Sequence, residues 1–352
     1  MTMPTTLCPN RMQVHSVYQE TPDVWTINLI NHDFYTYDPG QFALVSIENS
    51  GDTLRAYTLS SSPGLSPFIT ITVRRLDNGM GSNWLTQSVK PGDYLWLSDA
   101  QGEFSCANIA HDNYLMLAAG CGVTPIMSMV RWLLANKPSA NIKVLFNVRD
   151  EQQVIFSREW QYLLGQYPQQ LQLQLCIMQG SPDRGEITQG RLTQQKLAAL
   201  VPDIQSRVVM TCGPAAYMQN VQNFATELGV DAANFFMERF STEPLLSEPA
   251  LTEYKPSEAG KSTENSQTVM LKVRHQLTDY SVPVGISLLA AMELNKLPVV
   301  AACRAGVCGS CKTQIITGDY TQSSQMTLTA EEIEQGYVLA CSCQLRGNIE
   351  IA

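Results

Sequence analysis

Basic residues and histidines are scarce in this sequence. Of 352 residues, 23 are Lys or Arg and 32 are Asp or Glu, which gives a formal net charge of −9 at pH 7. A nucleic-acid partner would require clustered Lys and Arg, so none is expected, whereas an acidic protein suits a basic docking face on another protein. The four histidines lack the spacing of metal ligands and are interpreted as surface or structural residues: His15, His32, His111 and His275.

Long hydrophobic runs are also absent. No stretch reaches the ~18 consecutive apolar residues of a membrane-spanning helix. Residues 1–11 contain no apolar run behind a basic segment, so we expect no signal peptide. Ten cysteines without an export signal indicate a reducing compartment, in which thiols bind metal or lie buried. We therefore predict a cytoplasmic protein without a membrane segment.

Among the cysteines that are present, four near the end of the chain are spaced as C-x4-C-x2-C with a distant fourth: Cys303, Cys308, Cys311 and Cys341. This is the spacing of a plant-type [2Fe–2S] site. Each iron takes two thiolates, so the four sulfurs must converge, and three of them come from one tight loop. Gly306 and Gly309 suit that loop, because it needs positive φ angles that glycine adopts readily.

Other uses of these cysteines compete with the cluster. Short cysteine spacings also make structural zinc sites, and Cys343 could add a ligand. Zinc sites usually pair two C-x2-C segments, whereas the first segment here is C-x4-C, so iron is favoured. Inert thiols or disulfides are the remaining alternative. The sequence Leu-Ala-Cys before Ser342 resembles the last-ligand position of plant-type ferredoxins, which points to Cys341 and not Cys343 as the fourth ligand.

Up to about residue 106 the hydrophobic pattern has period two. Trp25, Ile27 and Leu29 alternate with polar residues, and Pro-Gly turns separate short runs of this kind. The pattern predicts an antiparallel β-barrel or sandwich, which we place at residues 9–108. Within it, Arg55-Ala56-Tyr57-Thr58 taken alone is an ordinary strand. Gly79-Met80-Gly81-Ser82 is a glycine-rich turn before a short helix, and free N–H groups at a helix start suit a phosphate.

From about residue 111 onward predicted strands alternate with helices, one of them over residues 154–164. The alternation predicts a parallel sheet covered on both faces, which we place at residues 109–241. Ligands of such sheets bind at the carboxyl ends of the strands. The segment Gly120-Cys121-Gly122-Val123-Thr124-Pro125 lies there, but it is not G-x-G-x-x-G and does not identify a nucleotide site alone. Cys212-Gly213-Pro214 follows a later strand.

Taken in order, these motifs resemble those of the ferredoxin–NADP reductase superfamily of flavoproteins. The resemblance implies that Arg55 contacts a flavin phosphate, that Tyr57 lies against the isoalloxazine ring and that the Thr58 hydroxyl lies near the reactive ring nitrogen. It assigns Gly79, Gly81 and Ser82 to the phosphate turn. It also favours FAD over FMN.

The same resemblance supplies a pyridine-nucleotide site. Its residues would be Gly120, Gly122, Thr124, Pro125, Cys212, Gly213 and Pro214, the last three beside the nicotinamide. Phe240, in Glu238-Arg239-Phe240, would shield the flavin where nicotinamide enters. Thr58 and Cys212 are the side chains expected nearest the hydride transfer. Asp183 would repel a 2′-phosphate, whereas Arg184 could attract one; we predict NADH as the coenzyme.

The remaining chain is divided by composition. Residues 242–266 are rich in Ser, Glu, Pro and Thr without helical or strand period, which predicts a flexible linker. Residues 267–352 resemble plant-type ferredoxins in the order of their predicted elements, which implies a β-grasp domain. Ser287 offers an N-cap for a helix over residues 288–294.

Two segments resemble, more narrowly, those of the NADH oxidoreductases that reduce the hybrid-cluster protein: Ala-Ala-Cys-Arg-Ala-Gly-Val-Cys-Gly and Tyr-Val-Leu-Ala-Cys-Ser-Cys. This resemblance implies electron flow from NADH through flavin and [2Fe–2S] to that partner metalloprotein, in anaerobic hydroxylamine or nitrogen-oxide metabolism. One alternative is the reductase component of a mono- or dioxygenase. Another is a redox-sensing cluster protein, against which the intact hydride-site motifs argue.

Overall fold

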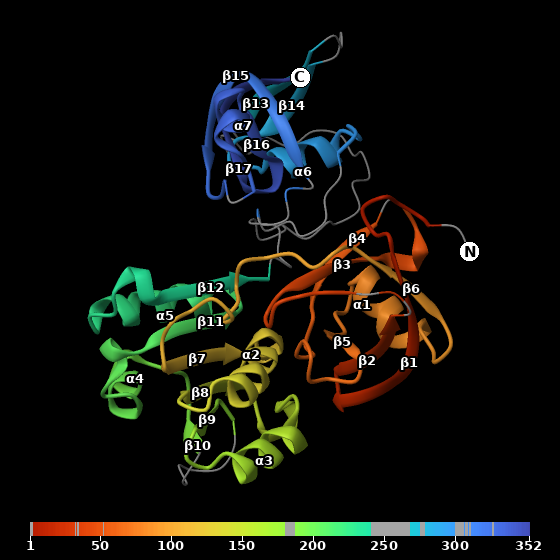
Figure 1. The fold of residues 1–352 in the computed structure, drawn as a ribbon. Helices are drawn as coiled ribbons and strands as arrows, with labels where there is room; N and C mark the ends of the chain where they lie inside the picture. The colour runs from red at the N-terminus through yellow and green to blue at the C-terminus, as the bar shows by residue number, and fades with distance from the viewer. Residues whose placement is uncertain are drawn as a thin grey trace, which may run out of the picture. The chain divides into compact units, whose positions relative to one another are not determined.

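The computed structural model describes residues 3–31, 33, 35–51, 53–179, 187–240, 268–274, 279–299, 306, 309, 311–325 and 327–352. The chain forms two compact units, Met1–Phe240 and Ser241–Ala352 (Figure 1). Each unit is built around its own hydrophobic clusters. Within the described residues, no helix combines the length and the apolar character needed to cross a bilayer.

The first part of the larger unit is an antiparallel six-stranded sheet in the order β4-β3-β6-β1-β2-β5. A bridge between Leu59 and Ile71 joins the two outer strands and closes the sheet into a barrel. Ile27 and Leu29 are fully buried inside it, as the alternation predicts. The elements are β1 (Asn10–Thr21), β2 (Val24–Asn31), β3 (Phe42–Ser46), β4 (Leu54–Thr58), β5 (Ile69–Arg74), α1 (Met80–Asn83) with a π-helical turn (Trp84–Ser88), and β6 (Tyr94–Leu97). The predicted antiparallel barrel is confirmed.

The second part of this unit is a parallel sheet in the order β10-β9-β8-β7-β11-β12. Alternate residues of β7 face opposite sides: Met116 packs with α2 and α3, and Leu117 with α4 and α5. The elements are β7 (Asn113–Ala119), α2 (Val123–Asn136), β8 (Asn141–Val148), α3 (Ser157–Gln166), β9 (Leu171–Ile177), β10 (Ile187–Gln189), α4 (Gln194–Leu200), β11 (Val208–Gly213), α5 (Ala215–Glu227) and β12 (Phe235–Arg239). The predicted α/β domain is confirmed.

The direction of strand addition reverses between β7 and β11. From β7 the chain adds β8, β9 and β10 on one side, and then returns to add β11 and β12 on the other. The turn after β7 and the end of β11 therefore lie next to each other at the carboxyl edge of the sheet. A switch point of this kind leaves a crevice in which open α/β sheets bind their ligands.

The smaller unit is a mixed sheet in the order β14-β13-β17-β15-β16, in which β13 and β17 are parallel and the other pairs antiparallel. Helix α6 packs its apolar face on the core, and the Ser287 hydroxyl accepts a hydrogen bond from Ala290 N–H at 3.1 Å, which confirms the predicted N-cap. The elements are β13 (Thr268–Val273), β14 (Asp279–Pro283), α6 (Leu288–Leu294), β15 (Lys312–Gln322), α7 (Ala330–Glu334), β16 (Tyr337–Leu339) and β17 (Cys343–Ile351). This is the predicted β-grasp fold.

Candidate active site

The end of β4 leaves a buried hydroxyl without a partner. The Thr58 side chain is 5% exposed, and its Oγ1 makes no hydrogen bond within the described part of the chain. An unpaired buried hydroxyl costs about 1–3 kcal/mol, so such a group indicates a ligand that completes it. Arg55 and Tyr57, on the same strand, are half-buried. This strand end fits a polar cofactor ring.

The glycine-rich turn before α1 packs directly on β4. A Cβ built on Gly81 would lie 3.1 Å from Arg55 Cγ and 3.1 Å from Tyr57 Oη, so a side chain there would displace both predicted flavin contacts. Ser82 Oγ accepts a hydrogen bond from Leu76 N–H at 3.1 Å and donates one to Gly79 C=O at 3.1 Å. The Ser82 hydroxyl therefore holds the turn closed. The structure brings Arg55, Tyr57 and Gly81 together as a cradle that fits a flavin phosphate.

At the switch point, the turn after β7 rests against the end of β11. A Cβ on Gly122 would lie 2.1 Å from Cys212 C=O oxygen and 2.7 Å from Gly213 N, a distance that no side chain tolerates. Gly120 has a φ of 54°, in the left-handed region. The Thr124 hydroxyl donates to Cys121 C=O at 2.9 Å and fixes the first turn of α2. The two predicted nucleotide segments are thus in contact.

The other predicted nucleotide residues take defined places at this edge. Pro125 lies in the first turn of α2, where its missing N–H leaves no donor unsatisfied. Pro214 is exposed and precedes the first residue of α5. Phe240 is half-buried and packs on the core of the parallel sheet. The segment that would contact the nucleotide 2′ position, Gly180 to Arg184, lies outside the described residues.

Buried titratable groups line the end of β11 and β12. Burial raises the pKa of the Cys212 thiol well above its ordinary value, and the nearby Glu238 carboxyl raises it further. Glu238 is 8% exposed, burial raises its pKa to about 8, and its Oε2 has no hydrogen-bond partner among the described residues. At neutral pH both side chains are therefore mainly protonated. They can hold protons beside a bound nucleotide without adding negative charge.

One site residue, Arg74, escapes the sequence motifs, and Glu238 lies in the Glu238-Arg239-Phe240 motif without a predicted role of its own. Arg74, at the end of β5, lies over the nucleotide turn, since a Cβ on Gly120 would be 3.0 Å from its Nη1. Glu238 faces the barrel, because a Cβ on Gly102 would be 3.9 Å from its Oε1. Both side chains therefore lie at the junction of the barrel and the parallel sheet. For Arg74 the sequence offers no signal, whereas the motif that ends in Phe240 already contained Glu238.

In the smaller unit two of the predicted cluster ligands meet. Cys311 Sγ lies 3.3 Å from Cys341 Sγ, and Gly306 N–H donates to Cys341 Sγ at 3.1 Å. Gly306 and Gly309 both have φ of 72°, as the tight loop requires. Cys303 and Cys308 lie outside the described residues. Within those that are described, no group of three potential metal ligands occurs.

Cys343, the alternative fourth ligand, is in a different environment. It is fully buried in the core of the smaller unit, and burial raises the pKa of its thiol to about 12. A ligand cysteine must be a thiolate, so this environment suits a structural thiol. The converging sulfurs of Cys311 and Cys341, with an N–H directed at one of them, fit an iron–sulfur cluster.

A short hydroxyl network holds the loop in place. Ser324 Oγ donates to Gly306 C=O at 2.6 Å, and Ser342 Oγ donates to Ser324 C=O at 3.0 Å. A Cβ on Gly306 would lie 2.8 Å from Ser324 Cβ, so the loop backbone is pressed against this network. Ser324, which follows β15, and Ser342, which follows β16, thus hold the backbone of Gly306 in place.

Three family models match successive parts of the chain. An oxidoreductase FAD-binding domain matches residues 22–106, an oxidoreductase NAD-binding domain matches residues 116–223, and a 2Fe-2S iron-sulfur cluster binding domain matches residues 272–346. The predicted cofactors, FAD, NADH and a [2Fe–2S] cluster, are therefore confirmed at the level of domains. The matches follow the order of the barrel, the parallel sheet and the β-grasp unit.

Relatives extend the similarity to the full length. The chain is 53% identical over 352 residues to NADH oxidoreductase HCR of Escherichia coli (strain K12), with 100% of both chains covered. It is 30% identical over 344 residues to the glycine betaine monooxygenase reductase subunit of Chromohalobacter salexigens, covering 95% of this chain and 93% of the relative. Both similarities span all three domains.

A solved structure shares the architecture. The phthalate dioxygenase reductase structure has a TM-score of 0.63 and 19% identity, with 97% of each chain covered. At this identity the match supports the fold alone. Taken with the family models and the full-length relatives, it leads to one assignment: the chain belongs to the ferredoxin–NADP reductase superfamily, as an NADH oxidoreductase with FAD-binding, NAD-binding and [2Fe–2S] ferredoxin domains.

Proposed function

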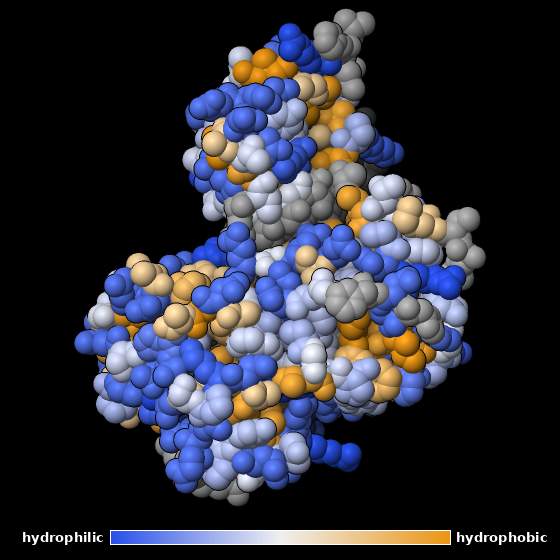
Figure 2. Space-filling model, viewed as in Figure 1, coloured by the Kyte–Doolittle hydropathy of each residue, from blue (hydrophilic) through white to orange (hydrophobic). Residues whose placement is uncertain are grey.

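We propose that this NADH oxidoreductase delivers electrons to a hybrid-cluster protein, in the order NADH, flavin, [2Fe–2S] cluster, acceptor. The observation that carries the proposal is the 53% identity over the whole chain to NADH oxidoreductase HCR. The acidic net charge of −9 suits docking on a basic face of a partner protein. Hydrophilic residues predominate on the face seen in Figure 2, with hydrophobic residues in small groups, a surface compatible with a transient partner.

When bound, the flavin accepts hydride from NADH and releases electrons singly, and the iron–sulfur cluster carries one electron at a time. This chain's residues supply position and environment. Arg55 offers a cation and the Gly79–Ser82 turn offers N–H groups to a phosphate, while the unpaired Thr58 hydroxyl is available to the flavin ring. Tyr57 offers an aromatic face.

On the nucleotide side, Gly120 and Gly122 allow the backbone to approach the coenzyme closely. Cys212 and Glu238 are buried at this junction, and because burial raises the pKa of both side chains they stay mainly protonated and add no charge near the transferred hydride. Phe240 would cover the flavin ring until nicotinamide enters. Cys303, Cys308, Cys311 and Cys341 would hold the cluster.

The proposed domain boundaries are residues 9–108, 109–241 and 267–352, and the predicted linker, residues 242–266, lies outside the described residues. The three matched family models lie inside the three proposed domains. We also propose a cytoplasmic location, because ten cysteines and a thiolate-bound cluster suit a reducing compartment.

A second acceptor class is supported by a specific relative. The glycine betaine monooxygenase reductase subunit is 30% identical to this chain, so the reductase component of an oxygenase is the alternative function. The internal chemistry would be the same, and only the docking partner would differ.

The test compares the two acceptors directly. The reductase is reduced with NADH under anaerobic conditions and mixed in a stopped-flow instrument with either a purified hybrid-cluster protein or a purified Rieske-type oxygenase component. We expect electron transfer to the hybrid-cluster protein to be at least about tenfold faster, a difference of about 1.4 kcal/mol in activation free energy. Faster reduction of the oxygenase would establish the alternative. Slow reduction of both, and of cytochrome c, would favour a sensing role.

A further inference from the structure

Two residues of α2, one helical turn apart, form hydrogen bonds with the segment that follows β4. Ser128, fully buried, donates from Oγ to Ser61 C=O at 2.5 Å, and the Ser62 hydroxyl donates to Ser128 C=O. Three residues further on, Arg131 Nη1 donates to Ser60 C=O. Residues three apart lie on one face of a helix, so this face of α2 is bonded to three consecutive residues of the barrel.

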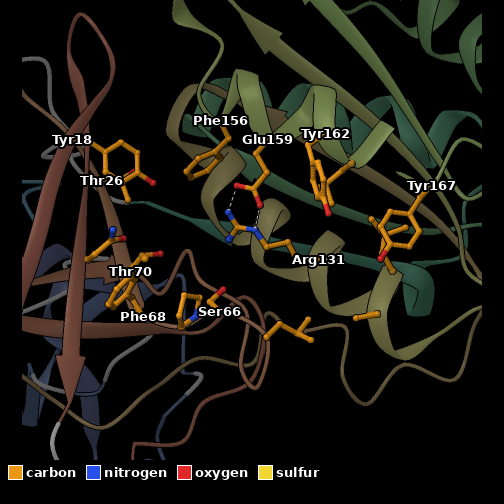
Figure 3. A pocket seen from close by; sticks show the side chains of 16 residues that line it. Tyr18, Thr26, Ser66, Phe68, Thr70, Arg131, Phe156, Glu159, Tyr162 and Tyr167 are labelled. Atoms are coloured by element: carbon orange, nitrogen blue, oxygen red, sulfur yellow. Dashed lines mark hydrogen bonds and ion pairs between the residues drawn. The ribbon is translucent and has the colours of Figure 1, made fainter. Parts of the chain in front are cut away.

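The rest of the Arg131 guanidinium is directed at α3. Its Nε donates to Glu159 Oε1 at 2.5 Å and its Nη2 donates to Oε2, which makes a bidentate pair. The guanidinium also lies 5.6 Å from the centre of the Phe156 ring. The side chains are only 17% and 32% exposed, and a bidentate pair with this burial holds its geometry better than a surface ion pair. Figure 3 shows the two side chains meeting between the helices.

A chain of hydrogen bonds returns from Ser60 to the parallel-sheet domain by another route. The Ser60 hydroxyl bonds Thr72 Oγ1 at 2.9 Å, and Thr72 Oγ1 bonds Thr26 Oγ1 at 2.9 Å. Thr26 Oγ1 donates to Glu20 Oε1 at 2.9 Å, and Glu20 Oε2 accepts Phe156 N–H at 3.2 Å. Phe156 directly precedes α3 and has a φ of 62°, an uncommon angle that this contact helps to hold. Arg131 contacts both Ser60 and Phe156, the two ends of this chain, so the contacts form a closed circuit that joins the barrel to the parallel-sheet domain.

The circuit joins the two elements that carry the reaction site. Ser60 comes two residues after Thr58, and α2 begins directly after the Gly120–Gly122 turn. The hydrogen bond between Ser60 and α2 thus fixes the position of β4 relative to the Gly120–Gly122 turn. Misplacement of reacting groups by about 1 Å can lower a rate about a hundredfold.

We propose that Arg131 and Glu159 are a positioning pair, which sets how the nucleotide domain presents the coenzyme to the flavin barrel. The inference rests on the proposed flavin and NADH sites. Neither side chain belongs to the residues assigned to those sites, so both act through Ser60 and α2.

The surroundings of the pair allow it to be altered without opening the core. Arg131 and Glu159 line a groove of about 570 Å³ between the barrel and helices α2 and α3, which is open to solvent (Figure 3). Water can therefore replace a lost guanidinium or carboxylate contact. A change in rate can then be separated from a change in folding.

The test uses the holoenzyme with Arg131→Lys, which keeps the charge but loses the planar fork, and Glu159→Gln, which keeps the shape but loses the charge. Anaerobic stopped-flow measures flavin reduction by NADH and by NADH deuterated at the transferred position. We expect the limiting rate to fall about tenfold in Arg131→Lys and about threefold in Glu159→Gln, with a larger deuterium isotope effect and an NADH Kd within about twofold of the parent. The matched control is Arg158→Lys, the same substitution at an exposed arginine of α3 next to Glu159, and this variant should behave as the parent.

The double variant sharpens the result. If the two residues act as one pair, the double variant should lose no more than Arg131→Lys alone, since coupled neighbours are not additive. Unchanged limiting rates in flavin-loaded single variants would overturn the inference. So would a rate loss that merely follows loss of bound flavin and of thermal stability, with an unchanged isotope effect. Absence of NADH-driven flavin reduction in the parent would overturn the proposed function itself.

Discussion

Titratable side chains have opposite roles at two sites. One site is the junction between the barrel and the parallel sheet in the larger unit, and the other is the predicted cluster site in the smaller unit. At the junction, burial raises the pKa of Cys212, of Cys121 to about 11 and of Glu238 to about 8, so these groups stay protonated. At the predicted cluster site, the sulfurs of Cys311 and Cys341 lie 3.3 Å apart, and Cys341 Sγ accepts a backbone N–H. The junction is therefore lined by neutral side chains, which suits hydride transfer, whereas the converging sulfurs suit thiolate ligands of a metal.

The comparison explains why one site is easier to identify from sequence than the other. Three of the four predicted cluster ligands fall within a short loop, so their spacing is visible in the chain. The junction is assembled from residues distant in sequence, such as Arg131 and Ser60, which are 71 positions apart. Cysteine spacing therefore identifies the predicted cluster site. Only the tertiary structure shows which residues hold the junction together.

The largest effect is expected at the predicted cluster site, where Cys341→Ala and Cys343→Ala should separate the two candidates for the fourth ligand. Cys341→Ala should lose the cluster and nearly all NADH-driven cytochrome c reduction, while ferricyanide reduction through the flavin persists. Cys343→Ala should keep the cluster and lose only about 1–2 kcal/mol of stability from the smaller core. Iron content and the EPR signal of the NADH-reduced protein measure the difference. The reverse pattern would make Cys343 the ligand.

At the junction the corresponding prediction is that Gly122→Ala lowers NADH-driven flavin reduction at least about a hundredfold, because misplacing the nucleotide turn misaligns the coenzyme. The physical cause is the 2.1 Å approach of the new Cβ to the backbone oxygen of Cys212, which cannot move aside. Gly165→Ala in α3 is the matched control, since no atom lies within 4 Å of its Cβ position. That control should stabilise the protein by up to about 1 kcal/mol. Flavin reduction and thermal unfolding of the two variants are compared; equal behaviour would contradict the contact.

The same contrast decides what the sequence could predict about the fold. Alternation at Ile27 and Leu29, and the strand–helix rhythm after residue 111, identify both sheets because burial follows period two and period 3.6. The helix expected from residue 154 begins instead at Ser157, because Phe156 takes a left-handed φ of 62°. The short strands β10 and β12 escape prediction, since they have only three and five residues, most of which are only partly buried.

The site divides in the same manner. Motifs point to Arg55, Tyr57, Gly81 and Gly122, whose neighbourhood the structure then displays. Arg74 and Arg131 have no motif, because their partners come from other domains or distant strands. For them the sequence offers only an arginine on a strand or helix, which is ordinarily solvated.

A smaller effect on the junction is expected from Thr58→Val. Valine keeps the shape of threonine but lacks the buried hydroxyl that has no partner among the described residues. If that hydroxyl serves the flavin ring, the limiting rate of flavin reduction should fall about ten- to a hundredfold, while the cluster EPR signal after chemical reduction stays unchanged. Thr58→Ser retains the hydroxyl and should stay within about threefold of the parent. Equal rates for Val and Ser would assign the hydroxyl no part in the transfer.

The smallest effect on activity, but a distinct one on stability, is expected from Glu238→Gln. Burial raises the Glu238 pKa from 4.5 to about 8, so between these values the native protein holds a proton that the unfolded chain has released. The stabilising contribution of this protonation is complete below pH 4.5 and is lost as the pH rises through 8. Glutamine does not titrate. Relative to the parent, the variant should therefore gain about 1.4 kcal/mol of unfolding free energy for each pH unit across this window.

The measurement can be confined to the larger unit, because all five tryptophans precede residue 241. Urea unfolding followed by tryptophan fluorescence at several pH values between 5 and 8 gives the difference between parent and variant. The exposed Glu103→Gln is the matched control for the loss of one carboxylate and should unfold as the parent does at pH 7. If the difference for Glu238→Gln is independent of pH, the Glu238 carboxyl is ionised in the folded protein. The junction would then hold a negative charge beside the coenzyme, and its contrast with the cluster loop would rest on geometry alone.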